Sequence, residues 1–278
     1  MRTTSKLLAA LTVVALALTV FAITGCTTPS TPPATPTTTT ATTAPSTANF
    51  KLVTPGQLTI GSDTTFPPFE SMKGTTAEGF DVDMMNAIGK ELGMKVVFQT
   101  ENFDTIIASL KAHKFDAIAS GMTITDERKK EIDFSDPYFD SNQSIAVLKK
   151  SGFTTQAQLA KKKIGVQSGT TGEKWATENL KPKGATIVPF KDATGAFAAL
   201  QAGSVDAVVN DLPVTAEIIK EGPTRGFIII DKIATGEQYG IAVAKDNPEL
   251  LKAINAAIAK IKGDGTLQNI YNKWIVTQ

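Results

Sequence analysis

Short apolar runs alternate with amphipathic segments from Phe50 to the end of the chain. Runs of about five residues rich in Val and Ile are typical of buried strands, whereas apolar positions that recur every three or four residues are typical of helices. The strands are expected at 57–62, 95–100, 115–119, 144–148, 163–167, 186–189, 205–209 and 227–231. The helices are expected at 80–92, 103–113, 172–180, 193–202, 213–220 and 248–262. This alternation predicts an α/β fold with mostly parallel sheets.

Two of the expected helices have ends that the sequence marks clearly. The helix at 248–262 is preceded by Asn247, a good N-cap residue, and has Pro248 at its first position. The helix at 103–113 ends on a polar run, so we expect His113, the single histidine, to be exposed to solvent.

One pattern occurs twice in the chain at an offset of 90 residues. Residues 110–120 read LKAHKFDAIAS, and residues 200–210 read LQAGSVDAVVN. A second pair is formed by Thr59-Ile-Gly and Lys163-Ile-Gly, each at the end of an expected strand. Because the Ile-Gly strand comes before the Asp-Ala strand in each half, the sequence predicts two related α/β lobes.

The first 49 residues differ from the rest of the chain. A basic start, an apolar run over 7–23 and the ending Ile-Thr-Gly-Cys resemble the lipobox of a lipoprotein signal peptide. Residues 1–26 are therefore expected to be the signal, with Cys26 lipid-modified; an uncleaved membrane anchor is the alternative. Residues 27–49 contain eleven Thr, five Pro and no charged residue, which indicates a linker. Either interpretation places the body of the protein outside the cytoplasmic membrane.

Composition narrows the possible functions. The chain has 28 Lys and Arg against 27 Asp and Glu, and a near-neutral protein is a poor non-specific binder of nucleic acid. Cys26 is the single cysteine, so the body is expected to contain no disulfide, thiol nucleophile or Cys/His metal cluster. Neither a cofactor nor a metal is expected.

Polar residues follow the expected strands in both halves. Ligands of parallel α/β sheets bind beyond the carboxyl ends of the strands, where loop N–H groups and helix N-termini point. If the two lobes face each other across these ends, they line a cleft for a small zwitterion. The residues in question are Asp63, Thr64, Phe66, Ser120, Gly121, Thr123, Gln167, Gly169, Thr170, Thr171, Asn210 and Asp211.

An α-amino acid needs a cation for its carboxylate and a carboxylate for its ammonium. Arg128 lies five residues after Thr123, close enough to fold back over that loop. Asp211 ends a strand in the opposite half. We therefore expect Arg128 and Asp211 to take the two ends of the ligand.

Six motifs resemble, in order, the solute-binding proteins of polar amino acid ABC importers, and the resemblance covers residues 57–276. It is strongest to the glutamine-, histidine- and lysine/arginine/ornithine-binding members. The motifs are IGSDTTFPPFE at 60–70, GFDVD at 79–83, GMTITDER at 121–128, DFSDPY at 133–138, QYG at 238–240 and IYNKW at 270–274.

This resemblance implies a periplasmic-binding-protein-like fold of type II, with two α/β lobes joined by a two-segment hinge. Lobe 1 would comprise 50–139 and 240–278, and lobe 2 would comprise 140–239, with hinge crossings near 140–142 and 236–239. The lobes would close on an L-amino acid, and the loaded monomer would deliver it to ABC permease subunits in the membrane. A lipid anchor would hold the protein on the outer face of the cytoplasmic membrane, or in the periplasm.

The resemblance also assigns roles to individual residues. Arg128, Thr123 and Thr171 would hold the ligand carboxylate, and Gly121 and Asp211 would meet the ammonium. Two aromatic residues would flank the ligand side chain, and an acidic residue would contact its polar end; these are Phe66, Phe103 and Asp63. From the residues alone, both aromatics could equally be core residues and the acid could cap a turn.

Departures from the glutamine-binding relatives favour a cationic ligand. Gln167 stands where those relatives have a lysine, and Asn210 stands where they have a histidine. Losing a cation near the pocket while keeping Asp63 admits a cationic side chain without repulsion, which favours arginine or lysine over glutamine. Glu70 is a second candidate acid, although Pro67-Pro68 would turn it away.

Two other classes of function are open at this point. Some proteins that resemble this family are cyclohexadienyl dehydratases, and such an enzyme would use Asp63 or Glu173 as its acid. The chain has neither a Gly-x-Ser-x-Gly nor a His-Glu-x-x-His motif, so a binding protein is expected rather than an enzyme. A ligand-sensing ectodomain that acts with a signalling partner is the other alternative.

Overall fold

The computed structural model describes residues 50–276. The expected signal peptide, Cys26 and the Thr/Pro-rich linker lie outside the described residues and stay predictions. Within 50–276, no helix combines the length and the apolar character that a membrane span needs.

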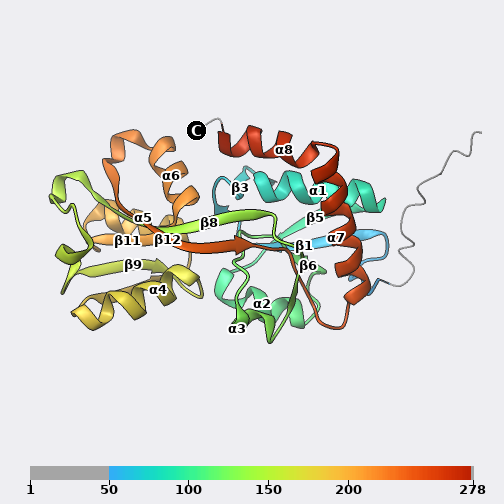
Figure 1. The fold of residues 1–278 in the computed structure, drawn as a ribbon, viewed down its shortest axis with the longest axis horizontal. Coiled ribbons are helices and arrows are strands. Elements are labelled where there is room, and N and C mark those ends of the chain that lie inside the picture. Colours follow the sequence, from blue (N-terminus) through green and yellow to red (C-terminus); the bar gives the residue numbers. More distant parts are fainter. Residues whose placement is uncertain (1–49, 277–278) are drawn as a thin grey trace, which may run out of the picture. The chain divides into compact units, whose positions relative to one another are not determined.

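Lobe 1 is built on a five-stranded sheet of order β5-β1-β6-β13-β7 (Figure 1). In it β1 pairs in parallel with β5 and β6, and β13 pairs antiparallel with β6 and β7. Its strands are β1 (Gln57–Ser62), β5 (Lys95–Thr100), β6 (Ala117–Ile118), β7 (Asp133–Phe134) and β13 (Ala242–Val243). Its helices are α1 (Phe80–Leu92), α2 (Phe103–Lys111), α3 (Asp126–Lys129), α7 (Pro248–Gly263) and α8 (Thr266–Tyr271). A small sheet of β2 (Thr65–Phe66), β3 (Glu70–Lys73) and β4 (Thr76–Glu78) precedes α1.

Lobe 2 is built on a second five-stranded sheet, of order β10-β9-β11-β8-β12 (Figure 1). Here β9 pairs in parallel with β10 and β11, and β8 pairs antiparallel with β11 and β12. Its strands are β8 (Phe139–Leu148), β9 (Lys163–Gln167), β10 (Thr186–Phe190), β11 (Ala207–Asp211) and β12 (Phe227–Tyr239). Its helices are α4 (Thr171–Asn179), α5 (Ala193–Ala202) and α6 (Leu212–Glu221).

The prediction of two α/β lobes is confirmed, but the sheets are mixed rather than mostly parallel. Each sheet is parallel over three strands and antiparallel at the other end. The long strands β8 and β12 account for this in lobe 2, because they pair antiparallel from Phe227 opposite Leu148 to Tyr239 opposite Phe139. Both strands are longer than the segments expected at 144–148 and 227–231.

The internal repeat of the sequence has a structural counterpart. In lobe 1 the Asp116 carboxylate accepts a hydrogen bond from the Thr59 N–H at 2.7 Å, and the Asp116 N–H donates to the Thr59 carbonyl at 2.8 Å. In lobe 2, Asp206 makes the same two bonds with Lys163, at 2.9 and 2.8 Å. Each aspartate therefore fastens the start of its own strand to the start of the Ile-Gly strand, as a duplicated unit would.

An aromatic cluster packs lobe 1 against the two chain crossings. The ring of Phe69, which is fully buried, lies 4.9 Å from Phe139 and 5.1 Å from Tyr239, centroid to centroid. Phe139 begins β8 and Tyr239 ends β12, and their own rings stack at 5.6 Å. Burying an aromatic side chain contributes about 1.5–3 kcal/mol, so this cluster fixes where the crossings leave lobe 1.

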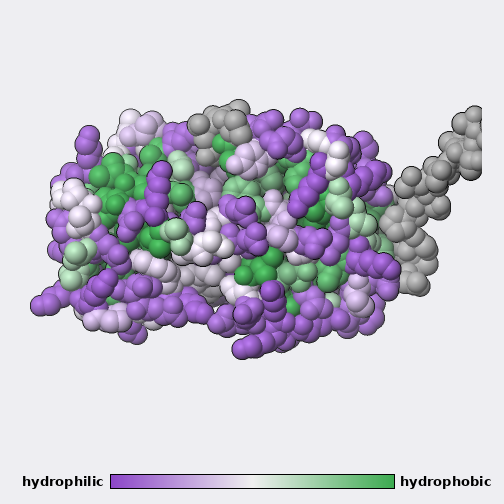
Figure 2. Space-filling model, in the orientation of Figure 1, coloured by the Kyte–Doolittle hydropathy of each residue, from purple (hydrophilic) through white to green (hydrophobic). Residues whose placement is uncertain are grey.

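Hydrophilic side chains cover most of the face shown in Figure 2, with smaller hydrophobic areas between them. Among residues 50–275, the large apolar side chains that are exposed are Val53 and Met72. The apolar residues of the strands and helices instead form the core beneath this surface.

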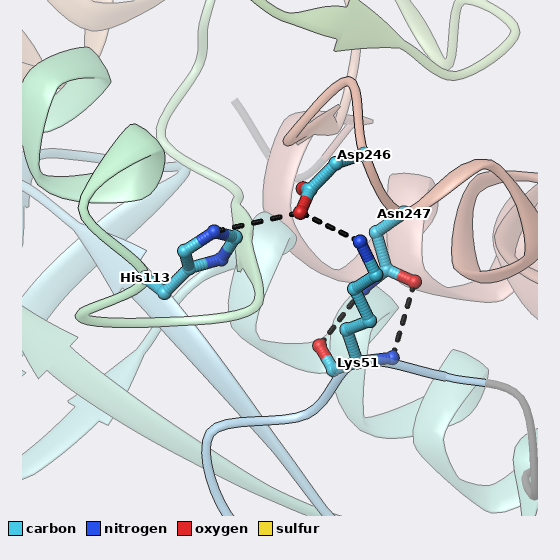
Figure 3. Close-up of polar contacts among 4 residues, drawn as sticks. All are labelled: Lys51, His113, Asp246 and Asn247. Atoms are coloured by element: carbon cyan, nitrogen blue, oxygen red, sulfur yellow. Dashed lines mark hydrogen bonds and ion pairs between the residues drawn. The ribbon is translucent and has the colours of Figure 1, made fainter.

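A polar clasp joins the start of the described chain to lobe 1 (Figure 3). The Asp246 carboxylate pairs with Lys51 Nζ at 2.8 Å and with His113 Nε2 at 3.6 Å. The Asn247 side chain accepts from the Lys51 N–H at 3.3 Å and donates to the Lys51 carbonyl at 2.9 Å. The sequence predicts that the Asn247 side chain caps α7. In the structure Asn247 is at the N-cap position, but its side chain makes no cap hydrogen bond and holds the N-terminal segment instead. His113 is half-exposed in this clasp.

The side chains of Asp246 and Asn247 are expected to contribute differently to the stability of the protein. Asp246→Ala should lower the free energy of unfolding by less than about 1 kcal/mol, because its ion pairs are solvent-exposed. Asn247→Ala should cost more, about 1–3 kcal/mol, because it leaves two backbone groups of Lys51 without their partners. Urea unfolding of both variants measures the difference. A larger loss for Asp246→Ala than for Asn247→Ala would contradict this assignment.

Candidate functional site

A small cavity lies between the two lobes, at the carboxyl ends of the central strands. Its volume is about 10 Å³, which is room for roughly one water molecule. Five lining residues come from lobe 1, namely Phe66, Phe103, Gly121, Thr123 and Arg128. Four come from lobe 2, namely Gln167, Thr170, Thr171 and Asp211.

Equivalent positions of the repeat meet at this cavity. Gly121 follows β6 and Asp211 ends β11, and the 90-residue offset relates the two. Gly121 has φ 52°, and a Cβ atom there would lie 3.0 Å from the ring of Phe66. Glycine is therefore favoured at this place, both by the left-handed backbone and by the close approach of the ring.

The positions just before these two lie behind the cavity. Ser120 Oγ donates to the Glu70 carboxylate at 2.8 Å and accepts from the Asp63 N–H at 2.9 Å. Asn210 is also buried, and its backbone carbonyl accepts from Ser144 Oγ at 2.8 Å. Ser120 and Asn210 were expected in the cleft, but neither lines this cavity. Asn210 lies within β11, where side chains alternate between the two faces, so its side chain leaves on the opposite side from that of Asp211.

A buried acidic layer supports the lobe 1 wall. Asp81 is fully buried, and its carboxylate accepts from the Gly121 N–H at 2.9 Å and from Tyr138 OH at 2.7 Å. Burial raises the pKa of Asp81 to about 7. Burial, together with the neighbouring Asp81, raises the pKa of Glu70 well above its ordinary value. Glu70 therefore lies beneath Ser120 as a supporting group and does not reach the cavity.

Arg128 connects the two lobes at the mouth of the cavity. Its guanidinium donates to the Thr123 carbonyl at 2.7 Å and to the Gly169 carbonyl at 3.0 Å, and it lies 5.2 Å from the ring centre of Phe103. The expected fold-back over the Thr123 loop is thus present, helped by Thr125 Oγ1, which caps the Arg128 N–H. A guanidinium has five N–H donors, so it can bind a further acceptor in this position.

Outside Arg128 lies a larger groove of about 510 Å³ between α3 and α4. Three residues line both this groove and the inner cavity: Arg128, Thr170 and Thr171. Gly169 lines only the groove, and its carbonyl accepts the hydrogen bond from Arg128. Two exposed side chains, Glu127 and Lys174, pair across it at 2.8 Å.

Asp211 is a buried carboxyl at the lobe 2 wall. Gln143 Nε2 donates to its Oδ1 at 2.7 Å, and Tyr239 OH donates to its Oδ2. Burial and then the carboxylate of Glu237 raise the pKa of Asp211 to about 7, against the lowering effect of these hydrogen bonds and of Arg128. Such a group gains from a cation placed beside it, because a cation stabilises the ionised form.

Asp63 does not line the cavity itself, but it meets lobe 2 through Gln167, which does. Thr65 Oγ1 donates to its Oδ1 at 2.5 Å, and the Gln167 side-chain amide donates to its Oδ2. Burial raises the pKa of Asp63 above its ordinary value. Gln167 therefore occupies the position next to Asp63 at which a polar ligand group is expected.

Glu237 was not among the residues that the sequence predicted at the site. Its carboxylate accepts from Thr123 Oγ1 at 2.8 Å and from Thr171 Oγ1 at 2.7 Å, so it contacts one residue of each lobe. The strand expected at 227–231 continues through β12 to Tyr239, with odd-numbered positions facing inward. The alternation of Ile233, Thr235, Glu237 and Tyr239 was the signal that could have found it.

Comparison with known proteins places this geometry in a family. Residues 58–277 match the family model of bacterial extracellular solute-binding proteins, family 3. The putative ABC transporter arginine-binding protein 2 of Escherichia coli K12 is 38% identical over 233 residues, which cover 82% of this chain and 95% of that protein.

Two solved structures are similar over nearly their whole length. An ancestral arginine-binding protein bound to arginine has a TM-score of 0.76 and 44% identity, over 79% of this chain and 98% of that one. An ancestral arginine-binding protein bound to glutamine has a TM-score of 0.74 and 42% identity, over 80% and 99%. The expected type II periplasmic-binding-protein fold is thereby confirmed. With two α/β lobes, a polar cavity between them and a family match over most of its length, the chain belongs to the bacterial extracellular solute-binding proteins, family 3.

Proposed function

We propose that this protein is an extracytoplasmic solute-binding lipoprotein that captures a polar L-amino acid by lobe closure and delivers it to an ABC importer. One observation carries the proposal: a guanidinium of lobe 1 and a buried carboxyl of lobe 2, Arg128 and Asp211, meet at one cavity. Opposite charges on the two walls match the two ends of a zwitterion. Thr123 and Thr171 add hydroxyl donors beside the guanidinium.

The side-chain end of the cavity favours arginine or lysine, with glutamine next. Asp63 is the acidic group there, and burial raises its pKa, so a cation beside it would be stabilised. Phe66 and Phe103 supply apolar walls for the methylene groups of a long side chain. The arginine- and glutamine-bound ancestral structures are both consistent with this order of preference.

Lobe movement is part of the proposal because the cavity is too small for an amino acid. We place the hinge crossings near 140–142 and 236–239, between a lobe 1 of 50–139 and 240–278 and a lobe 2 of 140–239. The pairing of Gln238 with Asp140 and of Glu237 with Ser141 supports this, because both crossings run side by side there. Two adjacent strands can flex together without breaking either sheet.

The location and partners follow the family. Its members are extracellular, and relatives carry names of ABC transporter binding proteins, so we infer a permease as the partner and no catalytic activity. Lipid attachment through Cys26 would keep the monomer near that permease. The proposal includes no cofactor, metal or nucleic acid.

A thermal-shift screen of the protein against the twenty amino acids, ornithine and citrulline tests the proposed function. A ligand present at 100 times its dissociation constant stabilises a protein by about 2.7 kcal/mol, so arginine and lysine should raise the melting temperature most. D-arginine serves as the matched control for stereochemistry. Absence of a shift with every L-amino acid would refute the proposal, and a shift with glutamine alone would refute the order of preference.

A further inference from the structure

Glu237 joins the two lobes from within the crossing strand. It lies on β12, three residues before lobe 1 resumes at Gly240, and its side chain is half-buried. One oxygen of its carboxylate accepts from the hydroxyls of Thr123 and Thr171, at 2.8 and 2.7 Å. Gln143 Nε2 lies 3.2 Å from both oxygens. Three donors from three segments thus converge on one carboxylate.

Two of these donors, the hydroxyls of Thr123 and Thr171, are groups that the proposed function assigns to the ligand carboxylate. Thr123 comes from lobe 1 and Thr171 from the start of α4 in lobe 2. Burial lowers the pKa of Arg128, and the nearby charges of Asp211 and Glu237 act in the opposite direction. A hydroxyl has a single proton to donate. Thr123 and Thr171 therefore cannot serve Glu237 and an amino acid carboxylate at once, and two carboxylates side by side would repel each other.

At the opposite end of the cavity, too, a group of the protein occupies the place at which a group of the ligand is expected. There the Gln167 amide donates to Asp63, where the proposed function places the polar end of the ligand side chain. The lobes therefore meet through a carboxylate at one end and through an amide donor at the other. Together the two groups present much of the hydrogen-bonding pattern of a polar amino acid.

We propose that Glu237 is an internal competitor that occupies the place of the ligand carboxylate. The inference rests on the proposed function for the identity of the ligand. Glu237 holds Thr123 and Thr171, and with them the two lobes, together in the absence of ligand. An incoming amino acid displaces Glu237 from the hydroxyls when the lobes open and close again. Glu237 thereby lowers the affinity for amino acids, whose carboxylate must displace it.

Calorimetry with arginine tests the competition. Glu237→Gln removes the charge, and Glu237→Ala removes the competing group; both variants should bind arginine about tenfold more tightly than the wild type. Agmatine, which is arginine without its carboxylate, should show no such gain. Glu249→Gln is the matched control, because it removes an exposed carboxylate at the start of α7, outside the cavity. Unchanged or weaker arginine binding in both Glu237 variants would overturn the proposal.

Small-angle X-ray scattering without any amino acid provides an independent test. The radius of gyration of Glu237→Ala should exceed that of the wild type and of Glu249→Gln, because the link between the lobes is lost. An unchanged radius would overturn the proposal. If no amino acid binds to any of these proteins, the proposed function fails, and scattering alone decides whether Glu237 links the lobes.

Discussion

Arg128→Ala is expected to weaken binding of the preferred amino acid by a factor of about 30 to several thousand. This corresponds to ~2–5 kcal/mol, the cost of deleting one partner of a buried charged pair. The guanidinium has its place at the cavity mouth, held by carbonyls from both lobes, and the aromatic ring of Phe103 lies against it. A ligand carboxylate would therefore meet a cation that is already oriented, which keeps the entropic cost of binding low.

Titration calorimetry on the wild type and two further variants measures this effect. Arg128→Lys should recover only part of the affinity, because an ammonium cannot make two parallel hydrogen bonds to a carboxylate. Arg225→Ala is the matched control, since this exposed arginine of lobe 2 does not line the cavity. Wild-type affinity in Arg128→Ala would show that the ligand carboxylate is held elsewhere.

Asp211→Asn is expected to abolish tight binding and to change how stability depends on pH. The pKa of Asp211 is raised to about 7 in the folded protein, above its ordinary value of 3.8. The folded state therefore binds the proton more tightly than the unfolded state. The stabilisation from this proton is complete below pH 4 and is lost as the pH rises to 7. Asparagine does not titrate, so the variant lacks this loss. Its free energy of unfolding should therefore rise by a few kcal/mol relative to that of the wild type between pH 4 and pH 8.

Binding should show the opposite trend with pH. A ligand ammonium requires the ionised form of Asp211, so arginine affinity should fall about tenfold per pH unit below pH 7 and level off above it. Near pH 6.5, binding should release protons, which calorimetry in buffers of different ionisation enthalpy detects.

Urea unfolding of the ligand-free proteins from pH 4 to pH 8 checks the stability part. Comparing each variant with the wild type removes the contributions of other buried acids, such as Asp81, whose pKa is also raised. Glu249→Gln is the control, because Glu249 is an exposed carboxyl at the start of α7. Parallel curves for Asp211→Asn and the wild type would contradict the assignment.

Local signals predicted the ends of several elements correctly. Helix α5 begins where Asp192 accepts a hydrogen bond from the Gly195 N–H at 2.7 Å, and it ends at Gly203 in the left-handed conformation. These are cap interactions between residues close in sequence, so a pattern of residue types is sufficient to predict them. The same holds for α1, which ends at Gly93.

Features that depend on distant pairing were harder to predict. β12 continues past Ile233 because Glu237, Gln238 and Tyr239 pair with β8 again beyond a register irregularity, whereas the local sequence Thr235-Gly-Glu indicates a turn. β11 likewise reaches Asp211, two residues beyond the expected end at 209. Asn210, expected in the loop after this strand, therefore lies within β11, where its side chain and that of Asp211 leave on opposite faces. The placement of Arg128 and Asp211 on opposite walls was predicted because it depends on strand order alone.

The equivalence of Gly121 and Asp211 restricts how this binding site can diverge. The two positions are related by the 90-residue repeat of the sequence, yet the left-handed backbone and the nearby ring disfavour a side chain at 121, most of all a large charged one. Changes of charge at this pair of positions are therefore confined to lobe 2. An evolutionary shift from amines to neutral or anionic solutes would have to pass through position 211, while its duplicate in lobe 1 stays glycine.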